Sequence, residues 1–541
     1  MSKATIHIEA AKLLKHCLET LSWNAVSEPF KDLAKTARCL VRLAAIAGIV
    51  ICAMACGGAG AGAPCSSNGD CDDSYQCLNQ ICSPRCDRNS DCGDGYLCKS
   101  GGLCELVISE LGDPCASEWD CGLGQSCILD GEDTDGNGQL ASTCQEQGQG
   151  GNVGSTCTAD GDCRNSLCTL GQCSQVCAAL EDCPEGNFCD SIPRVLASND
   201  YAYFNGCLPD TATLTTKFTM ESPAQRIRVP VPNSAKSFAI VASVNDSSHL
   251  VGVTRVIAPG GQRLFEEPES FEDFLTNPIR YSRSREVSTL TFPNDGLREI
   301  ERGIYEIDIE TSLPPFDGVG TAVPEVSVHY KLKESRVLDL TFYFADFEDH
   351  PCQDNMTGET LTALSAEDSN AFQEEYLKEI ADIFGRANII IGPQVTYKDV
   401  NPKRPDLDGI TNEQDLRSLF RTAENTQGIA IFLVRSLPFD GVQTLGTTIP
   451  GPPRTPGSSS SGIAVSMDAL CYRSWNSLAR VTAHSIAGQM GLWNNRDAAG
   501  IADPISDSDR STNNLMYFGE FGDTELSAGQ SRVLGLYPGL R

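Results

Sequence analysis

Apolar and polar residues alternate in short runs between residues 209 and 335, with proline, glycine and asparagine in the breaks. The alternating apolar positions are Ile227, Val229 and Val231, then Ile304, Ile307 and Ile309, then Val326, Val328, Tyr330 and Leu332. A period of two residues is that of a strand with one face on a core. The pattern therefore predicts an all-β sandwich over residues 209–335, suited to a spacer or a binding module.

Strand and helix patterns are mixed after residue 335. Short apolar runs predict strands at residues 338–344, 395–400, 429–434 and 462–466. A helical period places Phe372, Tyr376, Ile380 and Ile383 on one face, and further helices are expected near residues 415–424 and 475–490. Residues 336–541 are therefore expected to form an α/β (α+β) domain with a mixed sheet, so the chain as a whole is multidomain.

Cysteines follow a pattern of their own between residues 65 and 208. Twenty of the 26 cysteines fall there in five groups of four, and in each group the second cysteine follows an aspartate. The groups are Cys65, Cys71, Cys77 and Cys82; Cys86, Cys92, Cys98 and Cys104; Cys115, Cys121, Cys127 and Cys144; Cys157, Cys163, Cys168 and Cys173; and Cys177, Cys183, Cys189 and Cys207. Modules this small bury little apolar area, so disulfides worth about 2 to 4 kcal/mol each are expected to stabilise them. The spacing leaves three connectivities open in each group.

This internal repeat resembles the Dickkopf-type cysteine-rich repeats of extracellular animal proteins and of some bacterial surface lipoproteins. Such cysteine density is typical of an oxidising compartment, so the chain is expected to be exported. Cys352 and Cys471 are the only cysteines after the repeats and are expected to pair with each other. Zinc binding by the repeat cysteines is not expected, because no C-x₂-C pair occurs.

The first 56 residues have the features of an export leader. Basic residues precede an apolar run from Leu43 to Ala55, which is short for a membrane span and suits a signal peptide. The following Ala53-Met54-Ala55-Cys56-Gly57 resembles a bacterial lipobox, with alanine where leucine is usual. The resemblance implies a lipid on Cys56, an outer-membrane or cell-surface location, and a membrane anchor through a flexible Gly/Ala tether at residues 57–64. Plain secretion and an uncleaved anchor are the alternatives.

Near the C-terminus, the stretch from Ala483 to Asn494 is followed by Asn514-Leu515-Met516-Tyr517. Together they resemble the zinc-binding helix and Met-turn of a metzincin metalloprotease of the pappalysin-like kind, whose pattern is H-E-x-x-H-x-x-G-x-x-H. The corresponding positions read His484, Ser485, Gly488, Gly491 and Asn494. The resemblance implies a zincin-type domain with Met516 in its Met-turn, although a buried methionine there also fits simple packing.

The residues that differ from the metzincin pattern are those that would bind zinc and act as the general base. A catalytic zinc needs three protein donors, and Gly488 and Asn494 replace two of its histidine ligands. Ser485 stands at the position of the general base and cannot accept a proton from metal-bound water near neutral pH. We therefore expect no catalytic residue and no cofactor. The alternative is a non-standard zinc site, in which His484 binds the metal with an aspartate or a remote histidine. The candidates are Asp497, Asp503, Asp507, His249, His329 and His350.

Two further features bear on ligands. Asp133, Asp135 and Asn137 lie in an oxygen-rich, glycine-bent segment that has the look of a calcium loop but lacks the downstream glutamate of an EF-hand, which favours a solvated loop. The net charge of −31 argues against nucleic acid as a partner, because such a surface repels phosphate.

These features favour a cell-surface binding or adhesion protein with a catalytically inactive metzincin-like head that binds extracellular polypeptide. The alternatives are a zinc-dependent metallopeptidase with a non-standard ligand set and a structural envelope protein.

Overall fold

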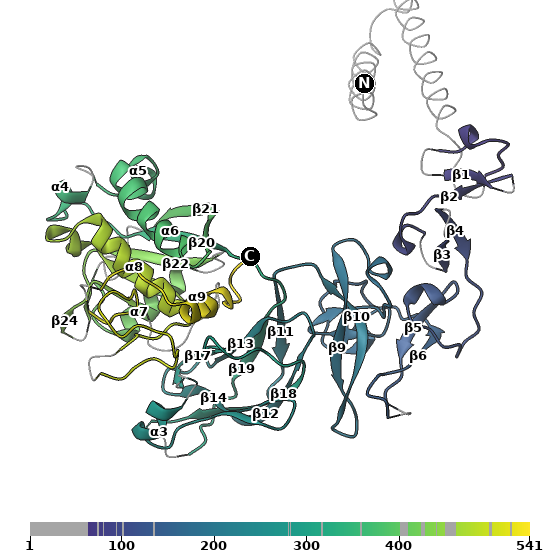
Figure 1. The fold of residues 1–541 in the computed structure, drawn as a ribbon, viewed down its shortest axis with the longest axis horizontal. Helices are drawn as coiled ribbons and strands as arrows, with labels where there is room; N and C mark the ends of the chain where they lie inside the picture. The colour runs from purple at the N-terminus through teal and green to yellow at the C-terminus, as the bar shows by residue number, and fades with distance from the viewer. Residues whose placement is uncertain are drawn as a thin grey trace, which may run out of the picture. The chain divides into compact units, whose positions relative to one another are not determined.

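The computed structural model describes residues 63–541 except 73–74, 79, 93–94, 100–101, 134–135, 278, 280, 282, 315–317, 357–359, 401–408, 424–427, 440, 449–460, 497–499 and 520–521. The leader and Cys56 thus lie outside the described residues. The chain forms two compact units, one ending at Ile108 and the other running from Ser109 to Arg541 (Figure 1). No helix of the described residues is long and apolar enough to cross a membrane.

The first unit holds the first two cysteine repeats. Each repeat is a short 3₁₀ turn followed by an antiparallel hairpin. The elements are η1 (Asn68–Asp70), β1 (Tyr75–Leu78), β2 (Ile81–Pro84), η2 (Asn89–Asp91), β3 (Tyr96–Lys99) and β4 (Leu103–Leu106). The third and fourth cysteines face each other across the hairpin, so each bonds a different cysteine of the preceding turn.

The second unit begins with the other three repeats, which have the same plan. Their elements are η3 (Glu118–Asp120), β5 (Gln125–Leu129), β6 (Ser142–Glu146), η4 (Asp160–Asp162), β7 (Cys168–Thr169), β8 (Gln172–Cys173), η5 (Leu180–Asp182), β9 (Asn187–Val195) and β10 (Tyr201–Pro209). In all five repeats the first cysteine bonds the third and the second bonds the fourth. Of the three possible connectivities the structure thus has one throughout. This region is disulfide-rich, which indicates an oxidising compartment.

The aspartate before each second cysteine closes the turn of its repeat. One carboxylate oxygen accepts hydrogen bonds from the backbone N–H groups three and four residues earlier, at 2.8 to 3.0 Å. The aspartates are Asp70, Asp91, Asp120, Asp162 and Asp182. The same bonds hold the pKa of Asp70, Asp91 and Asp162 below the ordinary value. The repeated aspartate therefore has a structural role.

Repeats three to five do not stand apart from the sheets that follow. Cys121, Cys127 and Cys144 share one hydrophobic core with strands of the sandwich. The Trp119 indole N–H also donates to the carbonyl of Asp182 at 2.8 Å, which joins the third repeat to the fifth. The cysteine pattern marks part of this difference, because the third and fourth cysteines lie much farther apart in the third and fifth repeats than in the others.

Residues 213–331 form two antiparallel sheets with a common core. Their strand orders are β11-β19-β13-β17 and β12-β18-β14-β15, with β16 paired to β14. The elements are β11 (Thr213–Phe218), β12 (Ala224–Val231), β13 (Ser237–Ser243), β14 (Leu250–Ile257), β15 (Arg263–Glu266), α3 (Phe271–Thr276), β16 (Ser284–Arg285), β17 (Val287–Phe292), β18 (Gly303–Ser312) and β19 (Glu325–Lys331). The predicted alternation lies on β12, β18 and β19, and its apolar side chains are buried.

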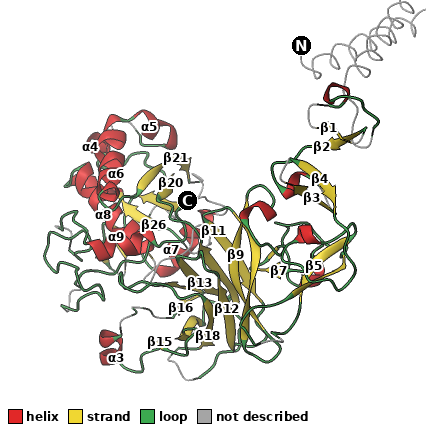
Figure 2. Ribbon diagram, turned by 45° about the vertical axis from the view of Figure 1, so that its right-hand side comes forward, coloured by secondary structure: helices red, strands yellow, loops and turns green. Residues whose placement is uncertain are grey.

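The C-terminal domain contains a mixed sheet and most of the helices (Figure 2). Its sheet order is β21-β20-β22-β26-β25, in which the first four strands are parallel and β25 is antiparallel to β26. The strands are β20 (Val337–Phe344), β21 (Ile390–Asp399), β22 (Ile429–Val434), β23 (Pro438–Phe439), β24 (Val442–Gln443), β25 (Gly446–Thr448) and β26 (Ile463–Ser466). The helices are α4 (Gln353–Met356), α5 (Ala363–Asp368), the π-helix η6 (Ala371–Leu377), α6 (Lys378–Gly385), α7 (Glu413–Phe420), η8 (Arg421–Ala423), η9 (Met467–Cys471), α8 (Trp475–Gln489) and α9 (Ala528–Gly535).

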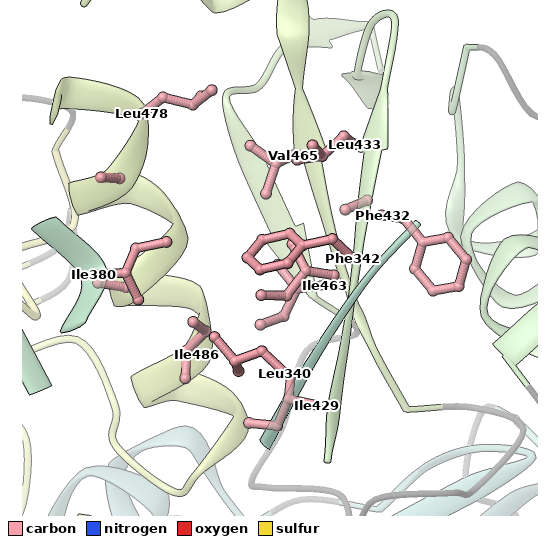
Figure 3. Close-up of a cluster of buried hydrophobic side chains, with 14 of the residues drawn as sticks. Leu340, Phe342, Ile380, Ile429, Phe432, Leu433, Ile463, Val465, Leu478 and Ile486 are labelled. Carbon is pink, nitrogen blue, oxygen red and sulfur yellow. The ribbon is translucent and has the colours of Figure 1, made fainter. Parts of the chain in front are cut away.

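Helix α8 packs on one face of this sheet. Its residues Leu478 and Ile486 turn toward apolar side chains of the sheet, among them Leu340 and Val465 (Figure 3). The opposite face carries Phe432, whose ring lies 5.7 Å from that of Phe420 on α7. Cys352 is bonded to Cys471, which staples the segment before α4 to the segment before α8. The sheet thus fixes the position of α8, which carries His484.

Candidate functional site

Helix α8 has clear stop and start signals. The Ser474 hydroxyl caps its N-terminus by accepting from the Ser477 N–H. At the other end Gly491 adopts a φ of 118°, which favours glycine, and the Leu492 N–H donates to the Ala487 carbonyl at 3.0 Å. The chain therefore turns sharply after α8 and places Asn494 back beside the helix.

The His484 imidazole is half-buried and points toward the loop that contains Met516. Its Nδ1 lies 2.9 Å from the carbonyl oxygen of Leu515, which can only accept, so Nδ1 carries the proton. Burial lowers the pKa of His484 to about 4, against the smaller opposing effects of the Leu515 carbonyl and a side-chain hydrogen bond with Asn494. The ring is therefore neutral near pH 7, and Nε2 keeps its lone pair.

Gly488 and Asn494, which stand where the metzincin pattern has its second and third zinc ligands, lie near His484, but neither offers a strong donor. An added Cβ at Gly488 would meet no heavy atom within 4 Å, so the face one turn after His484 is open. Asn494 contributes a neutral amide. At the position of the general base, the hydroxyl of the buried Ser485 donates to the Val481 carbonyl at 3.1 Å, within its own helix.

The loop with Met516 is built to support this geometry. Met516 is buried, and its N–H donates to the Asn514 side chain at 2.8 Å. Its carbonyl accepts from the Asn495 N–H at 2.9 Å, so the loop is tied to the turn out of α8. Met516 thus lies in a packed turn directly after the residue that holds His484. This contact fits both a Met-turn and simple packing.

Arg480 is a central residue of the site that the sequence analysis missed. It lies one turn before His484, is 7% exposed, and donates to the carbonyls of Leu515, Tyr517 and Gly519 at 2.8 to 3.0 Å. The Leu515 carbonyl therefore accepts from both Arg480 and His484. An arginine on a helix usually lies at the surface, so the sequence carried no signal of this role.

Two of the three aspartates considered as alternative ligands, Asp503 and Asp507, accept hydrogen bonds from helix α9 or its N-cap. Asp507 accepts from the Ser527 hydroxyl and the Gly529 N–H, both at 2.9 Å, and so caps that helix. Asp503 accepts from the Ile505 N–H at 3.1 Å, and burial raises its pKa to about 6. Asp497 lies outside the described residues.

The three remote histidines each have hydrogen-bond partners elsewhere. His249 pairs with Asp246 at 3.0 Å, His350 Nδ1 accepts from the Cys352 N–H at 3.1 Å, and His329 bonds the Thr215 hydroxyl at 2.9 Å. The described structure therefore brings together His484, Gly488 and Asn494, and shows no contact between these histidines and His484.

A catalytic zinc does not fit the donors on this face of α8. His484 presents one imidazole nitrogen, whereas zinc sites use three protein donors of imidazole, thiolate or carboxylate type. The amide of Asn494 suits harder cations. The nearby Arg480 guanidinium also disfavours positive charge at His484, as its lowering of the His484 pKa shows.

The segment with the proposed calcium ligands forms hydrogen bonds within its own loop. The Asp133 carboxylate accepts from the Gly138 N–H at 2.8 Å, and the Asn137 side chain accepts from the Gln139 N–H at 2.7 Å. Asp135 lies outside the described residues. The two described side chains thus serve as turn acceptors, as in a solvated loop.

No protein-family model and no curated protein matches the chain. The structure itself defines a disulfide-rich N-terminal region followed by a mostly β region with mixed sheets and helices.

Proposed function

We propose that the chain is a surface-anchored binding protein whose C-terminal domain is a metzincin-like protease domain without a working zinc site. One observation carries the proposal. His484 has the tautomer and orientation of a metal ligand, with Nδ1 bonded to the Leu515 carbonyl, while Gly488 and Asn494 offer nothing comparable. The supporting geometry is retained and the donor atoms are lost.

The order of elements supports the metzincin-like part of the proposal. Helix α8 follows the last parallel strand, β26, and the loop of Met516 comes back under His484. The short antiparallel strand β25 packs beside α8. Gly446 of this strand lies so close to the helix that an added Cβ would be 3.2 Å from Ser485 Oγ. This arrangement agrees with the order expected from the resemblance.

Strand β25 is the part of the domain best suited to bind an extended polypeptide. It ends the strand order of its sheet, and its only strand partner among the described residues is β26. The Ser466 N–H donates to the Leu445 carbonyl, so these two residues form a hydrogen-bonded pair of the ladder. Hydrogen-bonded and non-bonded pairs alternate along an antiparallel ladder, so Thr448 belongs to a non-bonded pair and its N–H points away from β26. An incoming strand would pair with backbone groups that point away from β26 in this way.

A peptide-display selection on the full oxidised chain tests this function. Selected peptides are expected to bind the wild type and to lose about tenfold or more in affinity on Thr448→Pro, which removes one outward N–H. The matched control is Thr448→Val, which loses the hydroxyl bonds to Gly462 and Gln489 but keeps the N–H. Equal loss in both variants, or no selected peptide, would contradict polypeptide binding and favour a structural envelope protein.

Anchoring at the surface is part of the same proposal. The disulfides support an oxidising compartment, and the lipobox-like sequence supports a lipid on Cys56. Cys56→Ala is expected to move the protein from the membrane fraction to the soluble fraction of its host. The control Cys52→Ala should leave the protein in the membrane fraction. If both variants remain with the membrane, another anchor is responsible.

A further inference from the structure

A cavity of about 480 Å³ lies inside the second unit, between the sandwich and the C-terminal domain. Five cationic side chains line it: Lys236, Arg298 and Lys331 from the sandwich, and Arg336 and Arg532 from the C-terminal domain. The lining has only two acidic residues, Glu299 and Glu334. This is a local excess of positive charge in a chain with 41 basic and 72 acidic residues. We call it the basic cavity.

Lys331 is the most buried of the five cations, at 1% exposed. Its Nζ donates to the Ser335 carbonyl at 2.9 Å, the Ser335 hydroxyl at 3.2 Å and the Tyr537 carbonyl at 3.4 Å. These acceptors are neutral. Burial, helped by the neighbouring Arg336, therefore lowers the pKa of Lys331 to about 7.

Some cationic side chains of the basic cavity have hydrogen-bond donors without an acceptor among the described residues. Within the described residues Arg336 and Lys236 form no ion pair, and Arg298 Nη1 is buried with no acceptor. The other cations are partly balanced, because Arg298 Nε lies 3.3 Å from Asp295 and Arg532 lies 3.6 Å from Glu299. The guanidinium of Arg336 lies against Gly535, so close that a Cβ at that position would collide with it. A buried donor without an acceptor costs about 1 to 3 kcal/mol.

Glu299 and Glu334 balance only part of the positive charge that lines the cavity, and the remaining like charges repel each other. We propose that the basic cavity binds a small, multiply charged oxyanion, namely a phosphate or sulfate group. Guanidinium groups bind such oxygens with paired hydrogen bonds, and three arginines are present. The volume exceeds that of one phosphate and leaves room for a group attached to it. Because both domains supply cations, the bound anion would also join the sandwich to the C-terminal domain.

Isothermal titration of the full oxidised chain with inorganic phosphate, sulfate and glucose 6-phosphate, at constant low ionic strength, tests this proposal. One saturable site per chain is expected. Tighter binding of glucose 6-phosphate would assign the extra volume to an organic group, and equal binding would assign the site to the free oxyanion; either result supports the proposal.

Variants make the test specific. Arg336→Gln is expected to weaken binding about tenfold or more. Lys236→Gln alters an exposed side chain and so should fold normally, and it is expected to weaken binding less. The control is Arg263→Gln, which removes an exposed cation on β15 that is paired with Glu266. No saturable binding by the wild type, or an equal loss in Arg263→Gln and both cavity variants, would overturn the proposal.

Discussion

The Nδ1 atom of His484 lies 2.9 Å from the carbonyl oxygen of Leu515, the residue before Met516. A histidine that binds a metal through Nε2 is commonly held by such a bond from its other ring nitrogen. Here the bond persists beside a glycine and an asparagine that cannot complete a zinc site. The relationship suggests several experiments on the site and on the scaffold.

Supplying two further imidazole donors beside His484 should create a metal site. In the double variant Gly488→His with Asn494→His, we expect about one zinc per chain, because three imidazoles then surround one position and Gly488 has open space for a side chain. Metal content after dialysis measures it. The control adds His484→Ala to the same background and should lose the zinc. A double variant that stays metal-free would show that the backbone at residues 484, 488 and 494 does not place three side chains around one metal ion.

Acid should destabilise the fold through His484. Its pKa is about 4 in the folded chain, whereas an unfolded histidine titrates near pH 6.5. The unfolded state therefore binds more protons between these values, and stability falls as the pH drops from about 6.5 to 4. Urea unfolding should show a smaller loss on acidification in His484→Asn than in the wild type. His329 also has a pKa lowered to about 4, so it remains in both proteins as an internal reference. Identical pH profiles would contradict the burial of a neutral His484.

Removing Arg480 should loosen the loop of Met516. Arg480→Met leaves the carbonyls of Leu515, Tyr517 and Gly519 without their shared donor, and we expect a loss of about 3 kcal/mol in the free energy of unfolding. Hydrogen exchange should rise first in residues 514–519. Arg473→Met is the matched control, because Arg473 precedes the helix. Unchanged exchange in the loop would show that other contacts hold it.

The buried aspartate of the fifth repeat should matter for stability. Asp182 is 6% exposed and accepts from the Ala178 and Ala179 N–H groups at 2.8 and 2.9 Å. Asp182→Ala should cost about 1 to 3 kcal/mol, since two backbone donors lose the charged acceptor that a buried carboxylate supplies. Thermal unfolding under oxidising conditions measures it, with the exposed Asp200→Ala as control. Equal stability of the two variants would mean that the disulfides alone define the turn.

The central strands and helix α8 were predictable because their side chains are buried in continuous or periodic runs. The expected strand at residues 429–434 has the bounds of β22, and the expected helix at residues 475–490 differs from α8 by one residue. The predicted ends of strands were less accurate where they depend on pairing with a neighbouring strand. Strand β21 begins at Ile390 rather than at residue 395, because it pairs with β20 although Ile390 is 62% exposed.

The sequence pattern could not predict which segments contact each other in the fold. The helix expected to run to Glu424 ends as α7 at Phe420 and continues as a 3₁₀ turn. Repeats three to five share the core of the sandwich, and the cysteine spacing does not show which segments they contact. At the site, the motif indicated His484 and its changed neighbours, but the role of Arg480 required the path of the loop after α8.

Zinc stoichiometry of the wild-type chain tests the central claim most directly. The full oxidised chain, equilibrated with zinc and then dialysed, should contain far less than one metal per chain, with no change on His484→Ala, because one imidazole cannot hold the ion alone. About one zinc per wild-type chain, lost on His484→Ala, would contradict the account and indicate a metallopeptidase with a non-standard ligand set.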